Sequence, residues 1–528
     1  MLFSPQTKTV LYPNVAEPER IVTVLPEARR LNGHHIVVPH EMRAMQVMRH
    51  MGYPALSPIL TDYDWPSNPH KVPKPFDHQR QMAAFMTLHP RCFNLSDMGT
   101  GKTLATLWAL DYLMQRGLVR RALILSPLST IYRVWEDEIF NHFMSRRKCA
   151  VLYGDRGKRI STLAGDADFY ILNHDGLCIG GSKSNRGYVL GEFALQLKER
   201  EDIDCVVVDE GSSFKVSGTN KYKALRRVIE SKPYVYWLTG TPTPVEPTNA
   251  WSQARAVRPD YSESYLGLRE RTMQRVSQFK WVPKREGMAI AAGILQPAVR
   301  YERDECLDLP DVMIETRDVE HSPAQAKATE ELKKTLKTYL ATGKINVINE
   351  ATLRTKLIQI SCGAVYGEEH EVHRIDCAPR MQVLEEVIEQ AGHKILIFAP
   401  LTSVINMIYM ELGKRYSIER ITGSVSAAKR NDIFKRFQDS DAPRIIVADP
   451  GTMAHGLTLT RAATTIWYGP ADKPELYQQA NKRMDRPGQK NRMLIVRLAA
   501  TSLEREIFRR LDAREKMQGV ILNLVKEG

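Results

Sequence analysis

Short apolar runs, each ending in a small or polar residue, recur along this 528-residue chain and constrain its fold more than any other feature. Valine-, isoleucine- and leucine-rich runs that alternate with helical stretches are typical of buried strands in a parallel sheet. Two series of such runs, separated by a different segment, predict an α/β chain with two parallel-sheet lobes in tandem. The runs cover residues 122–126, 169–173, 205–209 and 235–239 in the first series, and 394–399, 444–449, 464–468 and 493–498 in the second.

The segment between the two series has a helical and charged character. Leu332, Leu336 and Leu340 recur at i, i+4 and i+8 among lysines and glutamates, which predicts an exposed amphipathic helix over 324–340. We therefore expect a mainly helical insert between the lobes. The expected divisions are a small N-terminal module at 1–65, a proline-rich linker at 66–75, lobe one at 76–260, the insert at 261–385, lobe two at 386–515 and a C-terminal tail at 516–528.

The N-terminal module offers one helical pattern. Met42, Met45 and Met48 share a face of a helix that Gly52 is expected to stop. A methionine stripe at this spacing is typical of a core, and we interpret it so. The glycine-flanked basic loop at 180–187 is either a surface excursion or an arm that contacts phosphates, and the sequence does not decide between them.

The charge of the chain favours a polyanionic partner. Seventy-four lysines and arginines against 61 aspartates and glutamates give a net charge of +13. Such a surplus suits phosphate contacts with nucleic acid, although a slightly basic solvated surface has the same composition. No apolar stretch is long enough to span a membrane, and the start lacks the layout of a signal peptide. We expect no membrane partner.

The seven cysteines are scattered and contain no C-x-x-C pair. A disulfide framework or a structural zinc site is therefore not expected, and a reducing compartment fits better. His34, His35 and His40 lie close together in the sequence, but no thiol or carboxylate cluster accompanies them. We predict no structural metal.

The strongest local signal is a glycine-containing turn at 96–103, which follows an apolar run and precedes a helical stretch. A strand, such a turn and a helix start together form a phosphate cradle, because glycines let backbone N–H groups approach phosphate oxygens. Lys102 can reach the β- and γ-phosphates, and the Thr103 hydroxyl can bind Mg²⁺. The strict pattern has glycine where this chain has Ser96. The residues expected to hold ATP are Met98, Gly99, Thr100, Gly101, Lys102 and Thr103.

A second signal is the carboxylate pair Asp209 and Glu210 at the end of an apolar run. Sites in α/β proteins gather at the carboxyl ends of strands, so the pair is expected beside the phosphate cradle. Asp209 would hold Mg²⁺, and Glu210 would orient and deprotonate the attacking water. Taken alone, such a pair is more often a solvated strand end.

The third signal is the basic stretch at 479–489. Arg483 and Arg486 lie three residues apart, which places them on one face of a helix. Guanidinium groups suit the charge that develops in phosphoryl transfer, so both are candidate arginine fingers supplied by lobe two. Without the other signals, this stretch would be an ordinary basic surface.

With these three signals in place, the chain resembles the superfamily-two helicases and translocases, and within them the Swi/Snf-type DNA translocases. The resemblance covers about residues 76–511, with the motifs in the family's order. Phe76-Asp77-His78-Gln79 looks like the segment whose glutamine reads adenine, which implies that role for Gln79. The resemblance further implies that the track is contacted by Pro127, Leu128, Ser129, Asn173, His174 and Thr452. The tryptophan block at 135–138 follows the first of these and belongs to the same track-contacting motif.

Other motifs imply coupling between nucleotide and track. Thr239, Gly240 and Thr241 match the Thr-Gly-Thr-Pro element that relays the nucleotide state, and Gln479 opens the stretch similar to Gln-Ala-x-x-Arg-x-x-Arg-x-Gly-Gln. The stretch 456–459 looks like Gly-Leu-Asn-Leu, which implies a nucleotide contact for Gly456. Gly423, Arg430 and Phe437 follow the family's Gly…Arg…Phe block, a set that adds to the resemblance in lobe two.

The chain departs from the family at one catalytic motif and in length. It reads Asp209-Glu210-Gly211-Ser212 where the family has Asp-Glu-Ala-His. The link that the family's histidine makes between the lobes is therefore lost, and Ser212 is expected to replace it only in part. The stretches between motifs are short, as in compact phage and bacterial members. No appended chromatin-reading domain is visible, which argues against a nucleosome remodeller.

The resemblance thus implies two RecA-like lobes and a motor that uses ATP and Mg²⁺ to move along double-stranded DNA. We expect it to work in the cytoplasm of a bacterial or phage-infected cell, associated with DNA; its protein partners are not predicted. Three alternatives stay open: a strand-separating helicase on DNA or RNA, a nucleotide-gated DNA clamp without productive hydrolysis, and a metabolic phosphate-loop kinase. The last would not need the motifs of lobe two.

Overall fold

The computed structural model forms two compact units, Met1–Cys306 and Leu307–Met517. The predicted linker at 66–75 lies largely outside the described residues, and the predicted tail at 516–528 lies wholly outside them. The structure describes residues 1–66, 74–128, 130–184, 187–243, 246–277, 280–306, 310–341, 350–366, 371–453, 458–471, 473–486 and 488–513.

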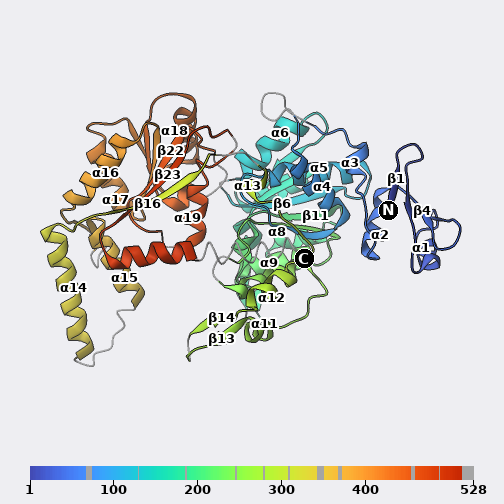
Figure 1. Cartoon of the computed structure of the whole chain (residues 1–528), viewed down its shortest axis with the longest axis horizontal. Coiled ribbons are helices and arrows are strands. Elements are labelled where there is room, and N and C mark those ends of the chain that lie inside the picture. Colours follow the sequence, from blue (N-terminus) through green and yellow to red (C-terminus); the bar gives the residue numbers. More distant parts are fainter. Residues whose placement is uncertain are drawn as a thin grey trace. The chain divides into compact units, whose positions relative to one another are not determined.

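The first unit is built on a seven-stranded parallel sheet with helices around it (Figure 1). All four strands predicted for this lobe are confirmed, with bounds that differ by a residue or two. The order across the sheet is β15 (Ala298–Val299), β5 (Arg91–Asn94), β12 (Tyr234–Leu238), β11 (Ile203–Val208), β6 (Arg121–Ser126), β8 (Phe169–Asn173) and β7 (Cys149–Val151).

Both faces of this sheet are buried, which explains why its strands are continuous apolar runs. Val206 and Val208 of β11 pack in one core cluster, while Cys205 and Val207 pack in another on the opposite face. The other strands and the helices of this unit supply the rest of both clusters. The helices that pack around the sheet include α4 (Asp77–Leu88), α5 (Lys102–Gln115), α6 (Asp137–Phe143), α7 (Arg156–Leu163), α8 (Glu192–Glu199), α9 (Asn220–Ile229) and α10 (Ala250–Val257).

The N-terminal module has its own small core. An antiparallel sheet in the order β1 (Leu2–Ser4), β2 (Thr9–Tyr12), β4 (Ile36–Pro39) and β3 (Arg29–Arg30) carries α1 (Pro18–Val24) and α2 (Met42–His50). The three methionines of α2 are buried, as predicted, and Gly52 follows the helix with a φ of +87°. A short helix, α3 (Ile59–Asp62), leads towards the lobe.

The expected insert is not a body of its own, because its two halves complete the two sheets. In the first half, α11 (Tyr265–Thr272), α12 (Gly287–Ile294) and the hairpin of β13 (Met273–Arg275) and β14 (Trp281–Pro283) lead to β15, which pairs with β5. In the second half, β16 (Val312–Asp318) pairs along its whole length with a strand of the second unit. An unpaired sheet edge is a liability, and these strands cover one edge of each sheet.

The second unit carries a six-stranded parallel sheet that includes all four strands predicted for lobe two. Its order is β16, β23 (Met493–Ala499), β22 (Ala462–Trp467), β19 (Lys394–Phe398), β21 (Ile445–Ala448) and β20 (Ile418–Ile421). The α/β class with two parallel sheets is therefore confirmed. Its helices are α14 (Pro323–Ala341), α15 (Glu350–Ser361), α16 (Ala378–Gln390), α17 (Thr402–Leu412), α18 (Ala427–Asp439) and α19 (Pro474–Asn481), and β17 (Ala364–Tyr366) pairs with β18 (Val372–Arg374).

In the part of the chain that the structure describes, no helix is long and apolar enough to cross a membrane. Among the same residues, no cluster of three or more histidines, cysteines or carboxylates could hold a metal ion by itself. Within the basic loop predicted at 180–187, β9 (Ser182–Ser184) pairs antiparallel with β10 (Gly187–Val189), and residues 185 and 186 lie outside the described residues.

Candidate functional site

The predicted phosphate cradle lies where β5 ends and α5 begins. Gly99 and Gly101 have φ values of +88° and +84°, a conformation that favours glycine. A Cβ atom at Gly101 would lie 2.0 Å from Nε2 of Gln79. The turn therefore favours glycine at 101, and a larger residue there would displace the Gln79 amide.

Lys102 and Gln79 converge on this loop from two different helices. The Lys102 ammonium donates to the carbonyl oxygens of Ser96 and Asp97, at 2.7 and 2.9 Å. Nε2 of Gln79 donates to the Thr100 carbonyl at 3.4 Å. The structure thus brings together the residues predicted to hold phosphates and the glutamine predicted to read adenine.

Residues just after β15 support the loop, and no sequence pattern pointed to them. The buried Ser96 accepts a hydrogen bond at its Oγ from the Tyr301 N–H at 3.0 Å. Asp97 forms an ion pair with Arg300 at 3.1 Å and accepts from the Arg303 N–H at 3.2 Å. Ser96, the departure from the strict glycine pattern, therefore has a structural role that glycine could not perform.

Asp209 follows β11, next to the strand that carries Ser126. Its Oδ2 accepts hydrogen bonds from the Ser126 hydroxyl at 3.0 Å and from the Trp135 indole N–H at 2.9 Å. Burial, and then the neighbouring charge of Glu210, raise the pKa of Asp209 to about 6, while the two hydrogen bonds and the charge of Lys102 oppose the rise.

Glu210 has the features of a residue held ready for a ligand. Its backbone is left-handed, with a φ of +47°, which is uncommon for a residue other than glycine. Its Oε2 is buried and forms no hydrogen bond within the described part of the chain. A buried carboxylate oxygen without a donor is costly, and a water or a cation at a nucleotide site would satisfy it. The residues present therefore fit Mg²⁺ and ATP.

The predicted relay element lies against the phosphate loop. Thr239 follows β12, and its Oγ1 accepts from the Thr241 N–H at 3.1 Å. A Cβ atom at Gly240 would lie 3.5 Å from the Ser96 carbonyl and 3.7 Å from the Met98 nitrogen. A shift of the loop would therefore be felt directly at 239–241.

The residues predicted to contact the track do not all face outwards. His174 is buried, and its Nε2 lies 2.9 Å from the Asp209 carbonyl oxygen. Trp135, from the tryptophan block with the same predicted role, is fully buried and bonds to Asp209. Leu128, by contrast, is 49% exposed, and Asn173 accepts from Arg159 at 3.2 Å. Ser129 lies outside the described residues.

The predicted arginine pair of lobe two does not share a helical face, because α19 ends at Asn481. Arg483 and Arg486 follow the helix in a series of turns. Arg483 is 1% exposed, and its carbonyl accepts from the Leu459 N–H at 2.9 Å. Arg486 is half-buried and donates from Nε to the Lys482 carbonyl at 3.0 Å. The prediction that both lie on one helical face is wrong.

Two further predicted residues belong to the second unit. Thr452 donates from Oγ1 to the Asp449 carbonyl at 2.7 Å, in a turn that follows β21. Gln479 is buried, and its Oε1 forms no hydrogen bond with the residues described. Gly456 lies outside the described residues.

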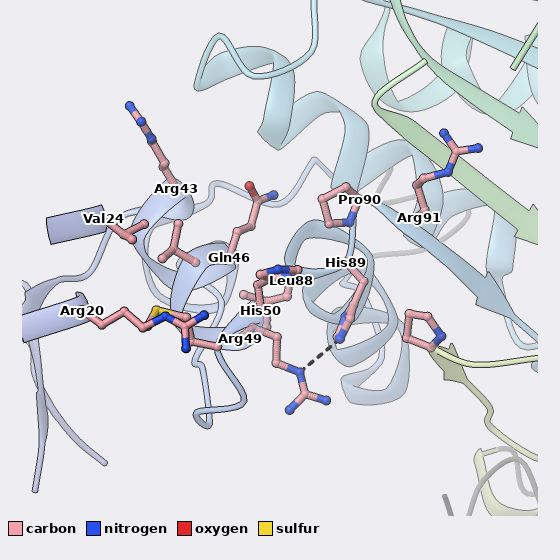
Figure 2. Close-up of a pocket in the computed structure, with 13 residues that line it drawn as sticks. Arg20, Val24, Arg43, Gln46, Arg49, His50, Leu88, His89, Pro90 and Arg91 are labelled. Atoms are coloured by element: carbon pink, nitrogen blue, oxygen red, sulfur yellow. Dashed lines mark hydrogen bonds between the residues drawn. The ribbon is translucent and has the colours of Figure 1, made fainter. Parts of the chain in front are cut away.

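A separate cavity of about 680 Å³ lies between the N-terminal module and the first lobe (Figure 2). Arg91, at the start of β5, lines it, whereas the phosphate loop follows the other end of β5. Arg91 donates to three carbonyl oxygens, and Arg49 donates to His89 at 3.1 Å, the bond drawn in Figure 2. This cavity is therefore not the nucleotide site.

A phosphate loop and an acidic strand end on neighbouring parts of one parallel sheet define a nucleotide-binding protein of the phosphate-loop class. The comparisons agree with this class and make it specific. The chain belongs to the SNF2-related domain family, whose model matches residues 78–360, and the helicase conserved C-terminal domain matches residues 379–488.

The chain is similar to several curated proteins. It is 26% identical to the ATP-dependent DNA helicase DDM1 of Arabidopsis thaliana over 80% of this chain and 58% of that protein. It is 26% identical to the chromodomain-helicase-DNA-binding protein 1-like of Mus musculus over 83% of this chain and 48% of that protein. The chain thus spans about half the length of these two relatives. It is also 24% identical to protein p41 of Acyrthosiphon pisum secondary endosymbiont phage 1, over 81% of this chain and 94% of that one.

Among solved structures, the Sulfolobus solfataricus SWI2/SNF2 ATPase core in complex with dsDNA matches with a TM-score of 0.41 and 22% identity. The match covers 87% of this chain and 94% of that one.

Proposed function

We propose that this chain is an ATP-driven motor that couples hydrolysis to movement along double-stranded DNA. The observation that supports it most is that one member of the SNF2-related family holds both the Lys102 loop and Glu210, whose Oε2 is buried without a hydrogen bond to the described residues. A loop of this kind binds the nucleotide, and a carboxylate base beside it makes the protein a hydrolase and not merely a binder.

The residues of the first unit divide the chemistry among them. The loop N–H groups and the Lys102 ammonium bind the phosphates, and Gln79 binds the adenine of ATP. Glu210 would take the proton of the attacking water at Oε2, the oxygen that forms no hydrogen bond with the described residues. Mg²⁺ would be held by Thr103 and Asp209, and when bound it neutralises phosphate charge.

The second unit would add a cation when the two units close on ATP. Arg486 is the stronger candidate of the pair because it is only half-buried, whereas Arg483 is fully inside its unit. Thr239, Gly240 and Thr241 would transmit the state of the loop, and Gln479 would do so in the second unit. Closure on ATP and release after hydrolysis would shift the population between two arrangements and so drive one step.

The proposed track is duplex DNA, contacted mainly at its phosphates by Pro127, Leu128, Asn173 and Thr452. The similarity to a DNA helicase and to a chromodomain-helicase-DNA-binding protein supports DNA over RNA. We place the motor on DNA in the cytoplasm of a bacterial or phage-infected cell, a setting that the similarity to a phage protein supports.

The proposal is tested by ATP turnover measured side by side with no nucleic acid, duplex DNA, single-stranded DNA and RNA. We expect the strongest stimulation by duplex DNA. Turnover that no nucleic acid stimulates, despite measurable ATP binding, would contradict a motor and favour a nucleotide-gated clamp. Stimulation by single strands alone would contradict a duplex translocase and favour a strand-separating helicase.

A further inference from the structure

The segment 265–286 of the first unit, α11 and the small hairpin that follows it, concentrates positive charge. Its six cations and two carboxylates, Glu270 and Glu286, give 6 − 2 = +4, about a third of the +13 of the whole chain. The hairpin of β13 and β14 projects from this unit beside α11, away from the sheet (Figure 1). The six cations are Arg269, Arg271, Arg275, Lys280, Lys284 and Arg285.

These cations are only partly neutralised: Arg271 forms an ion pair with Glu263 at 2.8 Å, and the Lys284 ammonium donates to the Glu270 carbonyl at 2.6 Å. Elsewhere in the same unit, Arg120 pairs with Asp204 at 2.9 Å and Arg200 with Asp202 at 2.6 Å. In the hairpin, the exposed side chains of Lys280 and Arg285 form no hydrogen bond or ion pair within the described residues. An ordinary solvated surface intersperses both signs of charge, so this imbalance favours an anionic partner.

The hairpin is anchored at its base. Thr272 is buried at the end of α11, and its carbonyl accepts from the Lys284 N–H at 2.8 Å. A Cβ atom at Gly287 would lie 2.3 Å from the same carbonyl oxygen, so only glycine lets α12 start this close to α11. Both ends of the hairpin therefore meet at one point of the scaffold, which fixes the base from which its cations project.

A tryptophan organises the cations further. Arg275 lies opposite Trp281 in the strand register, and the Arg269 guanidinium lies 4.5 Å from the centre of the Trp281 ring. Stacking on an aromatic ring restrains a guanidinium without neutralising its charge. The hairpin thus presents restrained positive charge, and the half-buried Trp281 holds it together.

We propose that the β13–β14 hairpin binds the phosphate backbone of nucleic acid, as a contact separate from the strand-end residues proposed to touch the track. A continuous polyanion fits because the cations are spread along α11 and the hairpin that follows it. This contact rests on the proposed function in one respect only, the choice of nucleic acid as the ligand. Binding here would be indifferent to sequence, since phosphates position a protein without specifying bases.

The test is equilibrium binding of a labelled duplex by fluorescence anisotropy between about 50 and 200 mM salt, without ATP. The variant R275Q/K280Q/R285Q is compared with the matched control K8Q/R29Q/R30Q, which removes three exposed cations from the N-terminal module. We expect the hairpin variant to bind about tenfold more weakly near 100 mM salt. Its salt slope should be smaller by roughly 2 to 3, because each neutralised phosphate contributes about 0.9 to the slope. The control should stay within about twofold of the unaltered protein.

A third variant, R275K/R285K, separates charge from structure. We expect it to bind like the unaltered protein, because a phosphate contact depends on positive charge more than on the planar, forked shape of a guanidinium. Equal reductions of affinity in the hairpin variant and the control, or a reduction in the lysine variant as large as in the glutamine variant, would overturn the hairpin contact. Failure of the unaltered protein to bind any nucleic acid would instead refute the motor itself.

Discussion

The two units share a parallel-sheet architecture but differ in what they place at the ends of their strands. In the first unit, the residues at the strand ends bond to one another: Lys102 to the loop, Ser126 and Trp135 to Asp209. In the second, the turn after β21 holds Thr452 against Asp449, and no phosphate loop follows its described strands. A shared fold therefore does not imply shared chemistry, because function lies in the residues added to it.

Both units also contain buried charge that holds the fold together. In the first unit the fully buried Asp111 pairs with Arg147 at 2.6 Å. In the second, Arg380 and Glu504 form a fully buried ion pair at 2.6 Å that joins α16 to the helical segment after β23. Burial alone would raise the pKa of Glu504, but the charge of Arg380 and the hydrogen bonds to the carboxylate hold that pKa below its usual range. Arg483 is equally buried, so the half-buried Arg486 is the better candidate of the two to contact a ligand.

The largest effect should come from Lys102→Ala in the first unit. The substitution removes the ammonium that orders the loop carbonyls and binds phosphate, so turnover should fall by more than about 10³-fold. The measurement is ATP turnover with duplex DNA, with circular dichroism as the control for folding. Residual turnover above about a tenth of the unaltered rate, in a folded protein, would show that the loop is not part of the nucleotide site.

Arg486→Ala tests whether the second unit takes part at all. We expect DNA-stimulated turnover to fall by about 10³-fold while ATP binding to the unstimulated protein barely changes, because the arginine would act only on closure. Arg486→Lys should rescue little, since an ammonium lacks the planar fork. Near-normal rates in both variants would confine the chemistry to the first unit.

Glu210→Gln should separate binding from hydrolysis within the first unit. The substitution keeps size and polarity but removes the base, so turnover should fall by about 10²-fold with ATP binding retained. Nucleotide binding is measured by equilibrium titration with a fluorescent ATP analogue. An equal decrease of binding and turnover would make Glu210 a direct metal ligand or a structural residue.

Trp135→Phe should have the smallest effect and decides between two roles for this residue. The substitution removes one hydrogen bond to Asp209, so the Mg²⁺ concentration needed for half-maximal turnover should rise by up to about tenfold. The DNA concentration needed should stay nearly constant. The reverse pattern would restore the track-contacting role expected from the sequence.

The sequence predicted the sheets well because buried parallel strands leave a strong apolar signal, as in 205–209 and 394–399. It did not predict β15, since two residues inside a charged, helical segment leave no periodicity to detect. It also misplaced Arg483 and Arg486, because the helix before them ends at Asn481 although the spacing suits a continuous turn. Both errors have the same cause, because tertiary contacts and not the local sequence pattern determine β15 and the end of α19.

The site was predicted as a set of residues but not as a network. The glycine motif and the Asp-Glu pair could be found because their chemistry requires fixed residue types. The support that Tyr301 and Arg300 give the loop could not, because about 200 residues separate them from Ser96 and Asp97 in the sequence. The inward placement of His174 depends likewise on a bond to the Asp209 carbonyl across the sheet.

The central claim, that hydrolysis in the first unit moves the chain along duplex DNA, is tested most directly by displacement of a third strand. A labelled triplex-forming oligonucleotide bound to one end of a duplex should be released by the unaltered protein with ATP. It should stay bound with Glu210→Gln or without ATP. Release that is equally fast without hydrolysis, or no release despite DNA-stimulated turnover, would contradict a translocating motor.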